Sequence, residues 1–82
     1  MSWVCYLLLC SDDTLYCGIT NDIDARLVAH NTGVGAKYTR GRIPVQLVHV
    51  ELCPDKSSAL KREFKIKQFS RAQKKNLYST KL

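Results

Sequence analysis

The stretch "LYCGITNDIDARLVAH", from Leu15 to His30, changes from a strand pattern to a helical pattern within a few residues. Leu15–Ile19 is predicted to be a β-strand, antiparallel to the apolar segment before it. The acids that follow fall where the dipole of a beginning helix favours negative charge. Asn21 is a good N-cap residue, so we predict a helix from there to about His30.

The rest of the chain supplies two more strands and two more helices. Trp3–Cys10 is a continuous apolar run, which is typical of a strand in the middle of a sheet with both faces covered. Val45–Glu51 alternates well enough for a third strand, and Ser57–Phe69 is rich in helix formers. An S-x-x-Q capping box at Ser70 predicts a separate last helix. We therefore expect one α+β domain over residues 1–82, a small three-stranded antiparallel sheet with helices packed on it, in the order β-β-α-β-α-α.

The turn between the first two strands decides which side chains share a face. Tyr6 and Tyr16 share one only if the loop between the strands has an odd number of residues. A three-residue loop, Ser11–Asp13, meets this condition and pairs Tyr6 with Gly18, which leaves space beside the phenol. Asp13 would then lie in the left-handed region, which aspartate tolerates better than most residues. Core packing is the ordinary role of such tyrosines.

Both long helices carry polar side chains on the face that should be buried. At about 100° per residue, Arg26 and His30 fall inside the apolar sector of the first helix. In the second long helix Glu63 falls within the apolar stripe, and Lys67 follows on the same side. That stripe is expected to consist of Ala59, Leu60, Phe64 and Ile66. Burying a charge without a partner is costly, so these groups need partners.

Three interpretations of these polar groups remain open. In the first interpretation, which is purely structural, Arg26 and Glu63 form one buried salt bridge. In the second interpretation, Glu63 and Lys67 form a local i, i+4 pair on a half-exposed edge. The third is functional and makes Arg26, His30 and Glu63 the lining of a shallow cleft.

Composition narrows the classes of partner. Thirteen Lys and Arg against seven Asp and Glu give a net charge of +6, concentrated in Lys37–Arg42 and Lys56–Lys75. Such an excess favours a polyanionic partner, because neutralising phosphates releases counterions. No apolar run approaches the roughly 20 residues of a membrane span, and the start lacks the pattern of a signal peptide. We therefore expect a soluble, cytoplasmic protein without a membrane partner.

The cysteines are interpreted as small buried hydrophobes rather than as ligands or disulfides. None of them forms a C-x-x-C pair, and zinc sites usually need tighter spacing than this chain offers. Disulfides are not expected in an intracellular protein. The four positions are Cys5, Cys10, Cys17 and Cys53.

Five positions in order resemble the GIY-YIG nuclease superfamily, in its small stand-alone subfamily. Tyr6 matches the tyrosine of "GIY", and "YCG" at Tyr16–Gly18 matches "YIG". The similarity continues at Arg26, which corresponds to the helix arginine, and at His30, which corresponds to the following His/Tyr position. Glu63 corresponds to the metal-binding glutamate. The resemblance covers nearly the whole chain.

The resemblance implies an endonuclease that cleaves a DNA phosphodiester with one divalent ion, Mg²⁺ or Mn²⁺. Glu63 would hold the ion, since a lone carboxylate suits a hard cation that keeps most of its waters. The ion and Arg26 would stabilise the charge that builds on the phosphate oxygens. Tyr6 or Tyr16 would take the proton of the attacking water; the family differs on which, so both stay open. His30 would hydrogen-bond the nucleophile or the other phenol.

The resemblance also implies contacts with DNA from residues around this site. Those residues are Lys37, Tyr38, Arg40, Arg42 and Lys67. Many catalytic relatives have lysine directly after the "YIG" glycine, where this chain has Ile19, and Lys37 or Lys67 would have to replace it in space. The alternative function is therefore a nucleic-acid-binding module that cuts slowly or not at all. DNA is the expected partner, with RNA as the alternative, and a further protein would supply targeting.

Overall fold

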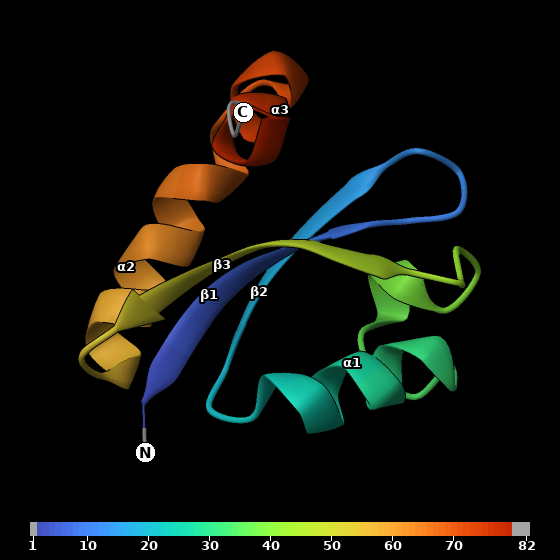
Figure 1. Ribbon diagram of the computed structural model, residues 1–82, viewed down its shortest axis with the longest axis horizontal. Helices are drawn as coiled ribbons and strands as arrows, with labels where there is room; N and C mark the ends of the chain where they lie inside the picture. Colours follow the sequence, from blue (N-terminus) through green and yellow to red (C-terminus); the bar gives the residue numbers. More distant parts are fainter. Residues whose placement is uncertain (1, 80–82) are drawn as a thin grey trace.

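A three-stranded antiparallel sheet forms the centre of the structure, a computed structural model that describes residues 2–79 (Figure 1). The middle strand is β1 (Trp3–Leu9), with β2 (Leu15–Thr20) on one side and β3 (Gln46–Cys53) on the other. The remaining elements are the helices α1 (Ile23–Asn31), α2 (Lys56–Lys67) and α3 (Arg71–Ser79) and the short 3₁₀ helix η1 (Lys37–Thr39). The predicted order, β-β-α-β-α-α, is confirmed.

The sheet is covered on both faces, which explains the unbroken apolar run of β1. Even-numbered β1 residues such as Tyr6 and Leu8 form one core cluster, against which Ile23 and Leu27 of α1 pack. Odd-numbered residues, with Cys17 of β2, form a second cluster that includes Ala59 and Ile66 of α2. We call these the α1 face and the α2 face. Successive side chains of a strand point to opposite faces, so both sets of β1 are buried.

The hairpin between β1 and β2 has the predicted three-residue loop. The amide of Cys10 donates to the carbonyl of Thr14 at 2.8 Å, and Asp13 has a φ of 67°. Tyr6 pairs with Gly18 and Leu8 pairs with Tyr16, so both tyrosines belong to the α1 face. A Cβ added at Gly18 would lie 2.6 Å from the hydroxyl of Tyr6, so the glycine leaves the space that the phenol occupies.

The N-cap of α1 is Asp22, and the predicted cap at Asn21 is wrong. The carboxylate of Asp22 accepts a hydrogen bond from the amide of Ala25 at 3.1 Å. Both residue types are good caps, so composition alone did not distinguish the two neighbouring positions. The last helix begins as predicted, with reciprocal bonds between Ser70 and Gln73 of 2.9 and 3.1 Å.

The buried stripe of α2 is narrower than the sequence predicts. Ala59 and Ile66 are buried, but Leu60 is 46% exposed and Phe64 is 70% exposed. The helix rests on a single sheet face whose strands present small side chains such as those of Cys5 and Cys17. Only one narrow line of α2 therefore reaches the sheet, and the prediction that Leu60 and Phe64 are core residues is wrong.

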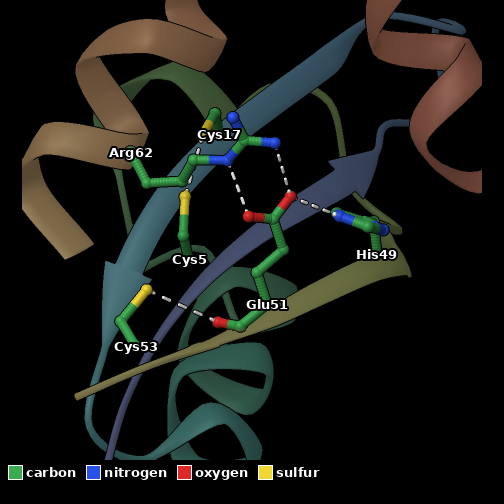
Figure 2. A network of polar contacts seen from close by, with 6 residues as sticks. All are labelled: Cys5, Cys17, His49, Glu51, Cys53 and Arg62. Atoms are coloured by element: carbon green, nitrogen blue, oxygen red, sulfur yellow. Dashed lines mark hydrogen bonds and ion pairs between the residues drawn. The ribbon is translucent and has the colours of Figure 1, made fainter. Parts of the chain in front are cut away.

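A polar network fixes α2 to β3 on the α2 face (Figure 2). Arg62 donates from Nε and Nη2 to the two carboxylate oxygens of Glu51, at 2.6 and 3.0 Å. His49 Nε2 lies 2.8 Å from the same carboxylate and must donate, because an ionised carboxylate only accepts. Arg62 and, to a lesser extent, His49 hold the pKa of Glu51 below its usual range. This network sets the side of α2 that faces β3.

All four cysteines are buried and free of disulfides, as predicted. Cys5 and Cys17 contact each other across β1 and β2, with 3.7 Å between the sulfurs (Figure 2). Burial raises the pKa of the thiols of Cys10 and Cys53, which keeps them protonated and unreactive near neutral pH.

None of the helices within residues 2–79 combines the length and the apolar character that crossing a membrane requires.

Candidate active site

Tyr6 of β1 and His30 of α1 begin a buried hydrogen-bonded chain. The Tyr6 hydroxyl lies 2.9 Å from His30 Nε2, and His30 Nδ1 lies 2.8 Å from the hydroxyl of Thr39 in η1. Thr39 donates its proton to the carbonyl of Ala36 at 3.0 Å, so it accepts from His30 Nδ1. His30 Nε2 is then an acceptor, and Tyr6 is the donor. The chain fixes the tautomer of the imidazole.

Burial keeps both members of this pair uncharged. Burial raises the pKa of Tyr6 to about 12, although the nearby Arg26 guanidinium acts in the opposite direction. Burial, and then the charge of Arg26, lowers the pKa of His30. Tyr6 and His30 are 1% and 0% exposed. Near neutral pH the two side chains therefore form a neutral donor–acceptor pair.

Arg26 joins the two phenols from the same helix face as His30. Interaction with Tyr6 raises the pKa of Arg26, and Tyr16 adds to the effect. Arg26 is only partly buried, because α1 carries it to the border of the apolar sector. The structure thus brings together four of the five predicted catalytic side chains, those of Tyr6, Tyr16, Arg26 and His30.

Tyr16 lies in a cluster of rings on the α1 face. Its ring centroid is 5.3 Å from that of His30, 6.3 Å from that of Tyr6 and 5.6 Å from that of Tyr38. The guanidinium carbon of Arg42 lies 4.1 Å from the centroid of Tyr38, within the range of a cation–π contact. Unlike Tyr6, Tyr16 is only half-buried.

The loop after α1 is tied to the hairpin turn. Arg42 donates to Asp12 at 2.8 Å and to the carbonyl of Tyr38 at 2.9 Å, and the Ser11 amide donates to the Arg42 carbonyl at 2.8 Å. The carboxylate of Asp12 accepts a hydrogen bond from the Thr14 hydroxyl as well as the one from Arg42. These bonds place Tyr38 beside Tyr16, whereas Lys37 and Arg40 are exposed on and after η1.

Glu63 comes from α2 and therefore from the other face of the sheet. Its carboxylate lies 3.3 Å from Lys67 Nζ, and its side chain is 19% exposed. This is the local i, i+4 pair that the sequence allowed. No ion pair joins Arg26 to Glu63 within residues 2–79, so the single buried salt bridge between the two faces is not formed.

A hollow at the edge of β2 connects the two faces. It has a volume of about 430 Å³, and we call it the β2-edge hollow. Its lining takes Tyr16 and Tyr38 from the α1 face and Lys67 from α2. The full lining is Leu15, Tyr16, Cys17, Tyr38, Lys67 and Lys74. Glu63 is not one of these lining residues, but its carboxylate contacts Lys67, which is.

Comparison with known proteins identifies the family. The family model of the GIY-YIG catalytic domain matches residues 2–76. This chain belongs to the GIY-YIG family. It is 55% identical to a UPF0213 protein from Halobacterium salinarum, over 89% of this chain and 95% of that protein. A UPF0213 protein from Staphylococcus saprophyticus is 53% identical, over 90% of each chain.

Solved structures support the same fold for this GIY-YIG domain. The solution NMR structure of a UPF0213 protein from Bacillus halodurans superposes with a TM-score of 0.62 at 43% identity, covering 99% of this chain and 86% of that chain. The solution NMR structure of a protein from E. faecalis gives a TM-score of 0.66 at 40% identity, covering 98% and 85%. This chain therefore shares its fold with both of these solved structures.

The position of Ile19 in this GIY-YIG domain can be compared with the positions of Lys37 and Lys67. Ile19 packs against the α2-face cluster and pairs with Cys5. A lysine in its place would extend from the face that carries Glu63. Lys67 lies on that face and lines the β2-edge hollow, whereas Lys37 is on η1. Of the two candidates to replace the family lysine in space, Lys67 has the better position.

The donor set of the GIY-YIG domain fits a magnesium-type ion. Within residues 2–79 no three His, Cys, Asp or Glu side chains gather as a metal-binding group. Among the predicted site residues Glu63 is the one carboxylate; it is partly exposed and contacts Lys67, which lines the hollow. Magnesium keeps several waters and binds through one or two carboxylates and substrate phosphates, so a single carboxylate fits it, whereas a structural zinc site takes four protein ligands.

Two supporting residues were missed by sequence reasoning. Thr39 orients His30, and a Cβ added at Gly35 would lie 2.6 Å from His30 Nδ1, so the loop backbone passes directly over the imidazole. The sequence gives no signal that separates buried Thr39 from exposed Thr32 in the same polar segment. Both roles depend on the path of the loop.

Proposed function

We propose that this GIY-YIG protein is an endonuclease that hydrolyses DNA phosphodiester bonds with the help of one divalent ion. The observation that supports the proposal most is the neutral Tyr6–His30 pair, which lies with Arg26 and Tyr16 on the α1 face. Tyr16 and Lys67 line one hollow, and Lys67 contacts Glu63. A binding module has no need of a carboxylate beside the phosphates it holds, because the two would repel each other.

We assign the role of general base to Tyr16. Tyr6 is buried and already donates its proton to His30, so it is poorly placed to meet an attacking water. Tyr16 lines the β2-edge hollow and is half-buried. Tyr6 and His30 then act as positioning residues that hold the aromatic cluster, and a base must lie within hydrogen-bond reach of the proton it takes.

Arg26 would stabilise the negative charge of the transition state directly, and Glu63 would do so through a bound metal ion. Arg26 is positioned beside both phenols, where a guanidinium stabilises the charge that builds on the phosphate oxygens. Glu63 would hold Mg²⁺ or Mn²⁺, which supplies Lewis acidity and lowers the pKa of bound water. Lys67 would exchange its contact with Glu63 for one with the substrate phosphate.

The substrate would be held along the same edge of the protein. Lys37 lies in η1, and Arg40 and Arg42 directly follow it. Tyr38 and Lys67 line the hollow itself. Such contacts go to the DNA backbone and carry little sequence information. We therefore propose structure-dependent or weakly sequence-specific cleavage inside the cell, with targeting supplied by a further protein.

The alternative function is a nucleic-acid-binding module with little or no cleavage. The observation in its favour is Ile19, which takes the place of the lysine that many catalytic relatives have. The basic residues of the loop and of α2 serve either function, because they neutralise phosphates in both cases.

A cleavage assay separates the two functions. Purified protein is incubated with single-stranded, duplex and branched DNA, with Mg²⁺, with Mn²⁺ and with EDTA. We expect metal-dependent cleavage that Glu63→Gln abolishes, while Lys65→Gln, which removes a charge from the far flank of α2, cuts like the wild type. Binding of DNA without cleavage under every condition would establish the alternative.

A further inference from the structure

A second hollow adjoins the β2-edge hollow and involves a helix to which no role has yet been given. It has a volume of about 200 Å³ and is lined by Thr14, Leu15, Tyr38, Arg71 and Lys74. Leu15, Tyr38 and Lys74 line both hollows, so the two are continuous along the edge of β2. We call the second one the α3 hollow, because α3 contributes its cations.

The two cations are held in place by the start of α3. Arg71 and Lys74 are three residues apart and so lie on the same side of the helix. The capping box of Ser70 and Gln73 fixes the first turn, in which Arg71 stands. The side chains therefore extend from an ordered helix rather than from a loose tail, and they face the hairpin turn.

One of these two cations, Arg71, already forms an ion pair with a carboxylate of the protein, that of Asp13. Arg71 Nη2 donates to Asp13 Oδ2 at 2.7 Å, and the two side chains are 46% and 73% exposed. Exposed ion pairs contribute only about 0–1 kcal/mol, so this bridge is easily exchanged for a stronger partner. Asp13 thus stands where an incoming anion would bind and competes with it for Arg71.

We propose that the α3 hollow is a second phosphate-binding subsite, in which Arg71 and Lys74 hold the backbone of the nucleic-acid strand that enters the β2-edge hollow. The inference rests on the proposed function, since it takes the ligand to be that same strand. Typical pockets for drug-sized ligands have about 300–1,000 Å³, so a hollow of about 200 Å³ fits a phosphate group better than a nucleoside. Continuity with the first hollow makes this phosphate a neighbour of the scissile one.

The subsite predicts opposite effects for neighbouring variants. Lys74→Gln and Arg71→Gln should each weaken binding about 3- to 10-fold and reduce the slope of log affinity against log salt by about 0.7, the value for one contact to a single strand. Asp13→Asn should tighten binding about 2- to 5-fold, because it removes the competitor of Arg71. Asparagine tolerates the left-handed conformation of this turn, so the hairpin is preserved.

Binding is measured by fluorescence anisotropy with a short labelled single-stranded oligodeoxynucleotide. All variants carry Glu63→Gln, so that no strand is cut during the titration. Lys65→Gln is the matched control, since it also removes one positive charge but lies on α2 away from both hollows. The subsite requires that Lys74→Gln and Arg71→Gln weaken binding more than this control does. It also requires that Asp13→Asn has no effect in an Arg71→Gln background.

Replacing single phosphates by neutral methylphosphonate linkages locates the contact. In the protein that carries only Glu63→Gln, one replacement near the cleavage position should weaken binding. Adding Lys74→Gln should make binding insensitive to that replacement. Equal effects of Lys65→Gln, Arg71→Gln and Lys74→Gln would overturn the subsite while leaving the proposed nuclease intact. Failure of the wild-type protein to bind or cut any DNA would overturn both.

Discussion

Tyr6 and Tyr16 carry the same phenol on neighbouring strands and the same sheet face, but their surroundings differ. Tyr6 is buried and bonded to His30, whereas Tyr16 borders solvent at the β2-edge hollow. The sequence predicted the shared face from loop length alone, because side chains alternate along a strand. It left open which phenol acts as base, because that depends on burial across three elements.

Replacing each tyrosine by phenylalanine should separate the two roles. Tyr16→Phe should lower the single-turnover cleavage rate about 100-fold or more with DNA affinity kept, as expected for loss of a general base. Tyr6→Phe should lower the free energy of unfolding by about 1–2 kcal/mol, because it leaves His30 Nε2 without its donor. Quench-flow kinetics and urea unfolding measure the two effects. A larger rate loss for Tyr6→Phe than for Tyr16→Phe would reverse the assignment.

His30 should make the fold sensitive to mild acid. Burial lowers its pKa in the native state, so below the unfolded value of about 6.5 the unfolded chain takes up a proton that the native state refuses. Stability is therefore complete above that value and is lost as pH falls through the window below it. Asp12, Glu51 and Asp55, whose pKa values are lowered, lose their contributions only in stronger acid.

The test is urea unfolding at several pH values for the wild type and His30→Gln, whose amide can still accept from Tyr6 and donate to Thr39. We expect the wild type to lose more stability than the variant between about pH 7 and pH 5. Parallel pH profiles would mean that His30 is not the group responsible.

At the scale of elements, local sequence signals located the strands and helices well but not every boundary. Turn length fixed the hairpin, and the capping box at Ser70 fixed the start of α3. The predicted N-cap of α1 was wrong by one residue, because Asn21 and Asp22 are both suitable caps. The apolar stripe of α2 was predicted too wide, because periodicity does not reveal that the helix contacts one sheet face along a single line.

The corrected cap leads to a prediction about α1. Asp22→Ala should lower the free energy of unfolding by about 1 kcal/mol, because it removes the side-chain acceptor of the Ala25 amide. Asn21→Ala should change it by less than about 0.5 kcal/mol, as is usual for surface positions. Urea denaturation of both variants gives the comparison, and equal losses would mean that the cap is shared between the two residues.

At the scale of the whole molecule, the candidate site combines side chains from opposite faces of one thin sheet. Tyr6, Tyr16, Arg26 and His30 belong to the α1 face, and Glu63 belongs to α2 on the other. Helical periodicity shows which side of a helix is apolar, but not which face of the sheet the helix will cover. The sequence therefore predicted the polar residues of both helices, but not that α1 and α2 would carry them on opposite faces of the sheet.

The central claim is that these two faces form one metal-dependent site at that edge. Mn²⁺ is paramagnetic and broadens NMR signals near its binding position, so a titration of ¹⁵N-labelled protein tests the claim directly. We expect selective broadening of amides around both Tyr16 on β2 and Glu63 on α2, and its loss in Glu63→Gln. Broadening confined to other parts of the protein, or unchanged in Glu63→Gln, would contradict it.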